Sequence, residues 1–239
     1  MRGAARRARA ADLRILSGLF SALPADFLPR LLAGVALDFE IAALGLGMGL
    51  VLGTPLAFGW AMRSRVRVVP NVIVQLLRAA PTFVVMFFLL NVLPREVHVL
   101  GMRLRITGEL TVALSLVPYS ASYVAENGAE ALCQWRSGSA LAALLFLPNV
   151  ARAYFVLVMS SGAAAAIGVP EGIAIILRQA DRLPAFSDRV KVFALGVLVF
   201  GTILQSGFLV VMAVRRHLTR LVLRRSKIAT LEGSGRQHA

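Results

Sequence analysis

The chain has 239 residues, of which 58% are hydrophobic and only 16% charged, and its mean hydropathy is +0.75. This composition excludes an ordinary soluble protein and predicts a polytopic membrane protein. A net charge of +14 would suit nucleic-acid binding, but the basic residues gather at the ends of apolar segments and in the tails. We therefore interpret them as topology signals and lipid-headgroup contacts, and we expect no nucleic-acid partner.

The first element is an arginine-rich segment. Residues 1–30 predict an amphipathic helix on the membrane surface, because Leu13, Leu16 and Phe20 recur near helical spacing beside arginines. The segment does not lead into an apolar core with a small-residue cleavage site, so we expect no signal peptide. Membrane insertion then depends on the internal segments.

About five apolar windows follow, each suited in length to a hydrocarbon core about 30 Å thick, which takes about 20 helical residues to cross. They are residues 35–62, 70–93, 110–125, 148–167 and 192–214. The fold class expected from them is all-α, with a transmembrane domain over residues 31–225. Residues 226–239 are polar and are expected to be disordered.

Small residues mark two places of close packing. Gly45, Gly49 and Gly53 recur every four residues, so they share one helix face that allows another backbone to approach. We favour internal packing over a dimer contact. Residues 160–171 are rich in small side chains and end at a proline, which predicts a break and then a short helix over 171–180. Pro184 and a run of charges predict a surface loop over residues 181–191.

The basic residues near the ends of the windows predict the orientation. The densest cluster follows the last window and places the C-terminus in the cytoplasm: Arg215, Arg216, Arg220, Arg224, Arg225 and Lys227. Five spans then place residues 63–67 and 126–147 in the cytoplasm and the N-terminus outside. The arginines among the first 14 residues oppose this last assignment, although they lie about 20 or more residues from the first span, where the rule weakens.

Charged residues also occur within or beside the windows. Arg78 and Pro81 precede an apolar run, which favours a position lined by protein or water, because a charge in hydrocarbon costs on the order of 3 kcal/mol. For Arg78 taken alone, we favour the alternative that it marks the cytoplasmic entry of a helix and snorkels to headgroups. Asp38 and Glu40 either attract cationic solutes in a cavity or, as we favour, face solvent at the outer end of their span. A pair between Arg78 and Glu126 is a further geometric possibility.

The sequence contains no motif typical of nucleotide hydrolysis, metal binding or enzymatic catalysis. No glycine-rich loop precedes either lysine, Lys191 or Lys227, so the chain lacks a phosphate-cradling ATPase loop. His98, His217 and His238 lie far apart, and the single cysteine, Cys133, forms no cluster. We therefore expect no catalytic residue, metal or cofactor. An intramembrane enzyme has little support, because no G-x-S-x-G or H-E-x-x-H pattern lies within a window.

Five short motifs occur in one order along residues 30–225. They are Gly34 and Gly53 followed by Arg63-Ser64; Arg78-Ala79-Ala80-Pro81 through Leu93-Pro94; Ser122-Tyr123-Val124-Ala125-Glu126; Leu147-Pro148; and Ile167-Gly168-Val169-Pro170-Glu171 with Arg178-Gln179-Ala180. In this order the chain resembles the permease subunits of bacterial ABC importers for polar amino acids, the histidine, glutamine and arginine uptake group. The resemblance implies a type I importer permease fold in the bacterial inner membrane.

The resemblance also implies partners and a solute path. The partners are a separate ATP-binding cassette ATPase subunit, a second permease subunit that is identical or different, a periplasmic solute-binding protein and membrane lipids. Chemistry would occur on the ATPase while the permease alternates between inward-facing and outward-facing states. The expected path or gate residues are Arg78, Pro81, Glu126, Ser160, Ser161, Pro170 and Glu171.

One departure from the family concerns ATPase coupling. The family carries E-A-A-x-x-x-G before its L-P, whereas this chain has Glu130-Ala131-Leu132 with Arg136 at the glycine position, in a segment shorter than usual. The expected coupling-loop residues are Glu130, Gln134, Trp135, Leu147 and Pro148. The shortened segment leaves a second hypothesis open, in which the chain is a diverged, non-transporting structural or regulatory partner of a permease.

Overall fold

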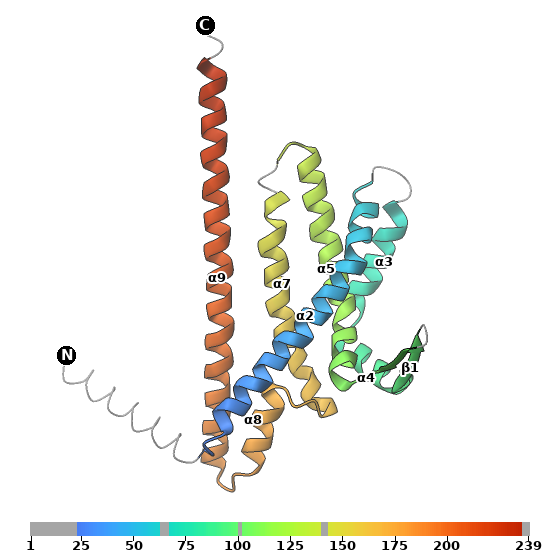
Figure 1. Ribbon diagram of the computed structural model, residues 1–239, viewed down its shortest axis with the longest axis vertical. Helices are drawn as coiled ribbons and strands as arrows, with labels where there is room; N and C mark the ends of the chain where they lie inside the picture. The colour runs from blue at the N-terminus through green and yellow to red at the C-terminus, as the bar shows by residue number, and fades with distance from the viewer. Residues whose placement is uncertain (1–22, 63–66, 100–101, 140–142, 236–239) are drawn as a thin grey trace, which may run out of the picture. The chain divides into compact units, whose positions relative to one another are not determined.

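The computed structural model describes residues 23–62, 67–99, 102–139 and 143–235 (Figure 1). The helices are α2 (Phe27–Trp60), α3 (Val68–Ala79), α4 (Thr82–Val92), α5 (Gly108–Arg136), α7 (Phe146–Ser161), the 3-10 helix η2 (Gly162–Ile167), α8 (Gly172–Asp181) and α9 (Phe186–Gly235). Strands β1 (Glu96–Val99) and β2 (Met102–Arg105) form a small hairpin. The all-α membrane class expected from the sequence is confirmed, with this hairpin as an unpredicted addition.

Each of the five apolar windows falls on helix. Among the described residues, three helical stretches are long and apolar enough to cross a membrane: Phe27–Trp60, Phe146–Ile167 and Phe186–His217. The pair α3 and α4 would make a fourth if the two helices, bent by 89° at their break, form one span. The 29-residue α5 is less apolar than these stretches, and many of its side chains are buried within the structure.

Contacts divide the chain into two compact units, which are described separately. One unit comprises residues 1–40 and 162–203, and the other comprises residues 41–161 and 204–239. The expected amphipathic segment 1–30 lies mostly outside the described residues, although α2 already begins at Phe27.

The first unit is built on an apolar core shared by three helices. Phe27, Leu31 and Val35 of α2 pack with residues of α8 and α9, namely Ile176, Val192 and Leu195. Gly168 has φ +84° and interrupts the chain between η2 and α8, because glycine adopts this left-handed conformation without steric cost. The short helix expected over 171–180 is confirmed as α8.

We expected a surface loop over residues 181–191, and this expectation is wrong for most of these residues. The turn after α8 is short, and α9 begins at Phe186. The charges that suggested a loop stabilise a helix start: Asp188 lies in the first turn, and Lys191 Nζ contacts its Oδ1 at 2.7 Å. At its other end α9 continues to Gly235, through most of the segment expected to be a disordered tail.

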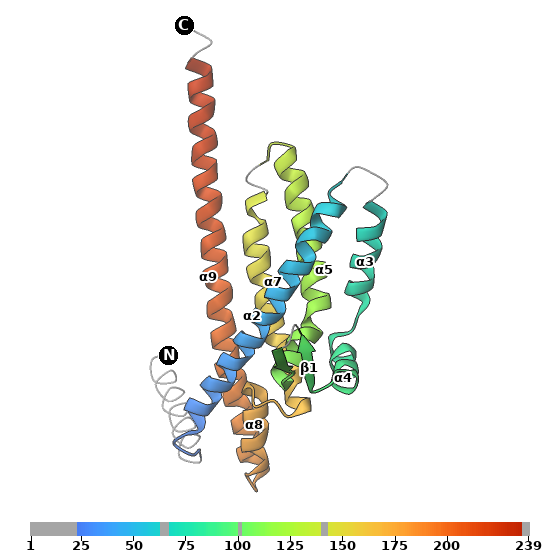
Figure 2. The same ribbon diagram turned by 45° about the vertical axis from the view of Figure 1, so that its right-hand side comes forward.

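The second unit is organised around α5. Figures 1 and 2 show α3 and α4 along one flank of α5 and α7 along the other. Residues 41–60 of α2 lie against a further side through the predicted glycine face. A Cβ added at Gly45, Gly49 or Gly53 would fall within 3.0 Å of atoms of α5, so the expected internal packing is confirmed.

The helix α5 extends well beyond its predicted window of 110–125. It begins after the cap Thr107, whose hydroxyl accepts from the Leu110 N–H at 3.3 Å, and it ends at Arg136. Its continuation over residues 126–136 was expected to be part of a loop, and the structure shows helix there instead. Helix-favouring residues such as Glu130, Ala131 and Leu132 continue the helix where the sequence analysis placed a loop.

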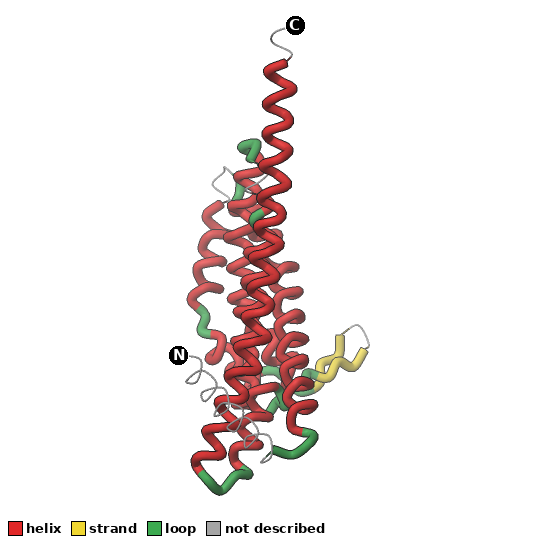
Figure 3. Tube along the Cα trace, turned by 90° about the vertical axis from the view of Figure 1, so that its left-hand side faces the viewer, coloured by secondary structure: helices red, strands yellow, loops and turns green. Residues whose placement is uncertain are grey.

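The tube trace in Figure 3 shows how strongly helix dominates the chain. The part of α9 that belongs to the second unit touches α7 by aromatic packing, with the rings of Phe155 and Phe208 5.1 Å apart. A Cβ added at Gly207 would collide with the Phe155 ring, so the close approach of the two helices depends on that glycine.

Candidate functional site

An ion pair joins two of the predicted path residues. Arg78 Nη1 lies 2.8 Å from Glu126 Oε1, which confirms the pairing considered from the sequence. Arg78 is in the last turn of α3 and Glu126 is on α5, so the pair ties the end of one helix to the side of another. Because the Arg78 side chain is 65% exposed, the pair contributes little to stability by itself.

Pro81 lies at the break between α3 and α4. It is the N-cap residue of α4, with extended backbone, and the Ala80 N–H donates to Leu77 O at 3.3 Å to close α3. A proline lacks the N–H that would continue the helix, and it forces the preceding residue out of helical conformation. The sequence Ala80-Pro81 therefore produces the bend.

A row of polar residues runs along α5 beside the row that contacts the glycines of α2. Tyr119, Tyr123 and Asn127 follow one another every four residues and are half-buried. Asn149 on α7 donates from Nδ2 to Asn127 Oδ1 at 2.9 Å. We call the set Tyr119, Tyr123, Glu126, Asn127 and Glu130 the α5 polar stripe.

Sequence reasoning found only Glu126 and Glu130 of this stripe. A usable signal was present, because the five residues share one helical face at spacings of four, three, one and three. A second missed residue is Arg152, the only charged residue between Phe146 and Ile167. It is exposed on α7, one helical turn from Asn149.

The predicted coupling residues lie at the ends of two helices rather than in a loop. Glu130, Gln134 and Trp135 are in the last turns of α5, where Gln134 Nε2 donates to Glu130 Oε1 at 3.0 Å. Leu147 and Pro148 are in the first turn of α7, with Leu147 exposed and Pro148 buried. The connection between the two helices is residues 137–145, of which 140–142 lie outside the described residues.

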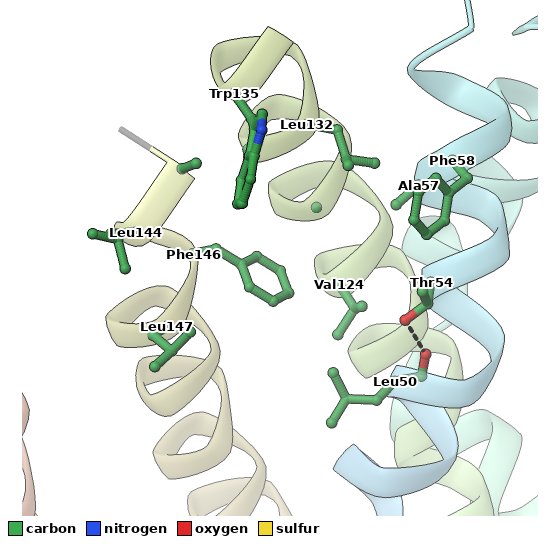
Figure 4. A pocket seen from close by; sticks show the side chains of 13 residues that line it. Leu50, Thr54, Ala57, Phe58, Val124, Leu132, Trp135, Leu144, Phe146 and Leu147 are labelled. Atoms are coloured by element: carbon green, nitrogen blue, oxygen red, sulfur yellow. Dashed lines mark hydrogen bonds between the residues drawn. The ribbon is translucent and has the colours of Figure 1, made fainter. Parts of the chain in front are cut away.

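An apolar groove opens beside these coupling residues (Figure 4). It has a volume of about 360 Å³ and lies between α2, α5 and the start of α7. Trp135 and Leu132 come from α5, Phe58 from α2 and Phe146 from α7. Trp135 is 71% exposed, so a large aromatic side chain stands at the end of the groove without cover from the described residues.

In the first unit, two acidic side chains are buried at the start of α8. Glu171 is the N-cap residue, and its two carboxylate oxygens accept from the N–H groups of Ile173 and Ala174, each at 2.7 Å. Asp38 Oδ2 accepts from the Gly172 N–H at 3.2 Å. Both carboxyl groups are 0% exposed, so the expectation that Asp38 faces solvent is wrong. Glu40 is exposed as expected.

Their burial follows from the glycines around them. A Cβ at Gly34 would come within 2.8 Å of the backbone of Glu171 and Gly172, so α2 and the start of α8 are in close backbone contact. The pKa of the Glu171 carboxyl is raised to about 7. Burial is the largest cause and the neighbouring Asp38 adds to it, while the N–H groups of Ile173 and Ala174 act in the opposite direction.

The remaining predicted path residues are divided between the units. Ser160 and Ser161 end α7 in the second unit, and their hydroxyls donate to Val156 O at 2.9 Å and Val158 O at 2.7 Å. Pro170 precedes the Glu171 cap in the first unit. The second unit thus brings together Arg78, Glu126 and, at the bend, Pro81.

The architecture is that of a helical membrane protein with three or four candidate spans among the described residues. A chain from the crystal structure of an amino acid ABC transporter with histidines has this fold: the TM-score is 0.56 at 17% sequence identity. The match covers 82% of this chain and 100% of that chain. No protein-family model matches the sequence, and no curated protein matches it.

Proposed function

We propose that the protein is the transmembrane permease subunit of an ATP-driven importer that moves polar amino acids or related small solutes across the bacterial inner membrane. One observation carries the proposal: the chain shares its fold with the whole length of a chain from an amino acid ABC transporter. The five ordered motifs of residues 30–225 support the same assignment. ATP hydrolysis belongs to a separate ATPase subunit, so this chain is not an enzyme.

The second unit supports a route from the ATPase to the solute path. The helix α5 carries the coupling residues Glu130, Gln134 and Trp135 at its C-terminal end and the polar stripe further along the same helix. Because a packed helix moves as a rigid element, a push at its end displaces the stripe as well. The Arg78–Glu126 pair links α3 to this movement, and the bend at Pro81 offers a hinge.

The proposal includes three protein partners and a location. They are an ATP-binding cassette subunit docked at the end of α5 and the start of α7, a second permease subunit, and a periplasmic solute-binding protein. The C-terminus lies in the cytoplasm, in agreement with the arginines that follow residue 214.

Co-purification followed by transport tests the proposal. The tagged full-length protein is purified from native membranes in mild detergent, and the subunits recovered with it are identified and reconstituted into vesicles. We expect an ATP-binding cassette subunit in the complex and ATP-dependent uptake of a polar amino acid. A complex without any ATPase subunit, or uptake that is independent of ATP, would contradict the proposal.

A second candidate is a diverged membrane partner that no longer couples to an ATPase. The specific observation in its favour is the short connection between α5 and α7, residues 137–145, together with Arg136 at the position of the family glycine. This candidate predicts that the chain is recovered with another permease and that removing its coupling residues leaves uptake by that permease unchanged.

A further inference from the structure

The α5 polar stripe runs beside the row of residues through which α5 contacts residues 41–60 of α2. The contact row includes Leu116, Ser120 and Val124, and Tyr119 and Tyr123 each follow a residue of that row by three positions. The tyrosines are half-buried, and the stripe reaches α3 through the Arg78–Glu126 ion pair and α7 through the Asn127–Asn149 hydrogen bond. The second unit therefore leaves a polar surface on α5 that none of these three helices fully covers.

The helix α7 adds a positive charge to this surface. Asn149 and Arg152 are three residues apart, so they share a face, and Asn149 is hydrogen-bonded to Asn127 of the stripe at 2.9 Å. Arg152 lies one turn beyond Asn149 on that face of α7, and Tyr123 lies one turn before Asn127 on α5, so the hydrogen bond brings Arg152 to the side of α5 that carries the tyrosines. The stripe and Arg152 thus form one continuous polar surface across two helices.

Of the two arginines beside the stripe, Arg78 and Arg152, only Arg78 has an acidic partner among the described residues. Arg78 is paired with Glu126 at 2.8 Å. No ion pair among the described residues includes Arg152, although it is exposed in a stretch that is otherwise uncharged. A lone arginine facing lipid within a span costs on the order of 3 kcal/mol, so such residues face protein or a watery cavity and mark solute pathways.

We propose that Arg152, Tyr119 and Tyr123 form a water-accessible site that binds the carboxylate group of the transported solute. The inference rests on the proposed function and adds a ligand group and three residues to it. A guanidinium binds a carboxylate through two parallel N–H bonds, and phenol O–H groups donate to the same oxygens. Every amino acid carries this carboxylate group, so the site recognises amino acids as a class and does not select one side chain.

A cysteine reporter tests the site without any transport step. The chain has a single cysteine, so Cys133→Ser gives a background without thiols. Val156→Cys then places a thiol one turn from Arg152 on the same face of α7. Val51→Cys is the matched control, because Val51 is 74% exposed on the apolar helix α2. Each variant is labelled in membranes with methanethiosulfonates that carry either a sulfonate or a trimethylammonium group.

We expect both reagents to label Val156→Cys and neither to label Val51→Cys. A positive charge about 6 Å from the thiol, in water, raises the local concentration of the sulfonate reagent about threefold and lowers that of the trimethylammonium reagent about threefold. After each rate is divided by the rate with a free thiol, the sulfonate reagent should therefore react about tenfold faster than the cationic one. Adding Arg152→Gln should remove this preference, and Arg152→Lys should retain it. An unreactive Val156→Cys, or a preference unchanged by Arg152→Gln, would overturn the site.

Protection from labelling tests the carboxylate itself. A mixture of glutamine, histidine and arginine should slow the labelling of Val156→Cys, whereas the methyl esters of the same three should not, since they lack the anion. Equal protection by both mixtures, or by neither, would overturn the carboxylate assignment. These readouts need no ATP and no partner, so a negative result leaves the importer proposal intact, and a failure of uptake leaves the site intact.

Discussion

At the scale of single residues, the buried acidic pair has a direct physical consequence. Glu171 binds a proton more tightly in the folded protein than in the unfolded chain, because burial raises its pKa from 4.5 to about 7. The stabilisation linked to this proton is fully present below about pH 4.5 and is lost as the pH rises through 7. The protein should therefore become less stable between pH 5 and pH 8.

Replacing Glu171 by glutamine should remove this pH dependence. Glutamine keeps an oxygen that accepts from the N–H groups of Ile173 and Ala174 but carries no charge to bury beside Asp38. Thermal unfolding of the purified protein at pH 5 and pH 8 measures the effect, which is up to about 3 kcal/mol in the original chain. Glu40→Gln is the control, since Glu40 is exposed on the same helix as Asp38. If Glu171→Gln loses as much stability between pH 5 and pH 8 as the original chain does, the prediction is refuted.

The sequence could not indicate that Asp38 is buried. Its neighbours suggested the outer end of a span, and only the fold brings the start of α8 against α2, where the Gly172 N–H needs an acceptor. The pairing of Arg78 with Glu126 was easier to predict from the sequence than the burial of Asp38, because both residues lie near predicted span ends on the same expected side of the membrane.

At the scale of elements, the glycine face of α2 shows what a pattern predicts reliably. Gly45, Gly49 and Gly53 share a face by spacing alone, and that face is in close contact with α5. Helix ends were less predictable. Charges near Pro184 suggested a loop over residues 181–191, but a first-turn aspartate and a lysine three residues later stabilise the start of α9.

Replacing Gly49 by alanine should destabilise the contact between α2 and α5. The new Cβ would lie 2.9 Å from the backbone carbonyl carbon of Ser120, so one helix must shift, at a cost of about 1 to 3 kcal/mol. Gly47→Ala is a closely matched control, because no atom lies within 4 Å of its added Cβ. The comparison is made by thermal unfolding of both variants. A melting temperature for Gly49→Ala equal to or above that of Gly47→Ala would show that the contact is not tight.

At the scale of the whole molecule, five windows and five ordered motifs were sufficient for the fold class. They did not indicate the proposed carboxylate site. The helical spacing of Tyr119 and Asn127 places both on one face of α5, but only the packing of α7 against α5 brings Arg152 to that side. The resemblance proposed the coupling residues, and the family pattern suggested a loop, whereas the structure places these residues in helices.

Replacing residues 130–136 by a flexible glycine-serine segment should abolish ATP-driven uptake and leave membrane insertion unchanged. The replacement removes Trp135 and the rigid last turns of α5, through which we propose that the ATPase acts. Uptake into vesicles and resistance of the protein to alkaline extraction provide the two readouts. The same replacement at residues 229–235, at the end of α9, is the control. Normal uptake after the first replacement would exclude a coupling role for this segment.

The break at Ala80-Pro81 makes this region sensitive to the lipid around it. With 12 and 11 residues, α3 and α4 are each less than about 20 Å long, so neither half alone matches a hydrocarbon thickness of about 30 Å. The depth that the pair covers depends on the angle between the halves. Thicker bilayers should therefore favour a straighter pair and thinner ones a sharper bend, so that acyl-chain length tunes the conformational balance through hydrophobic mismatch.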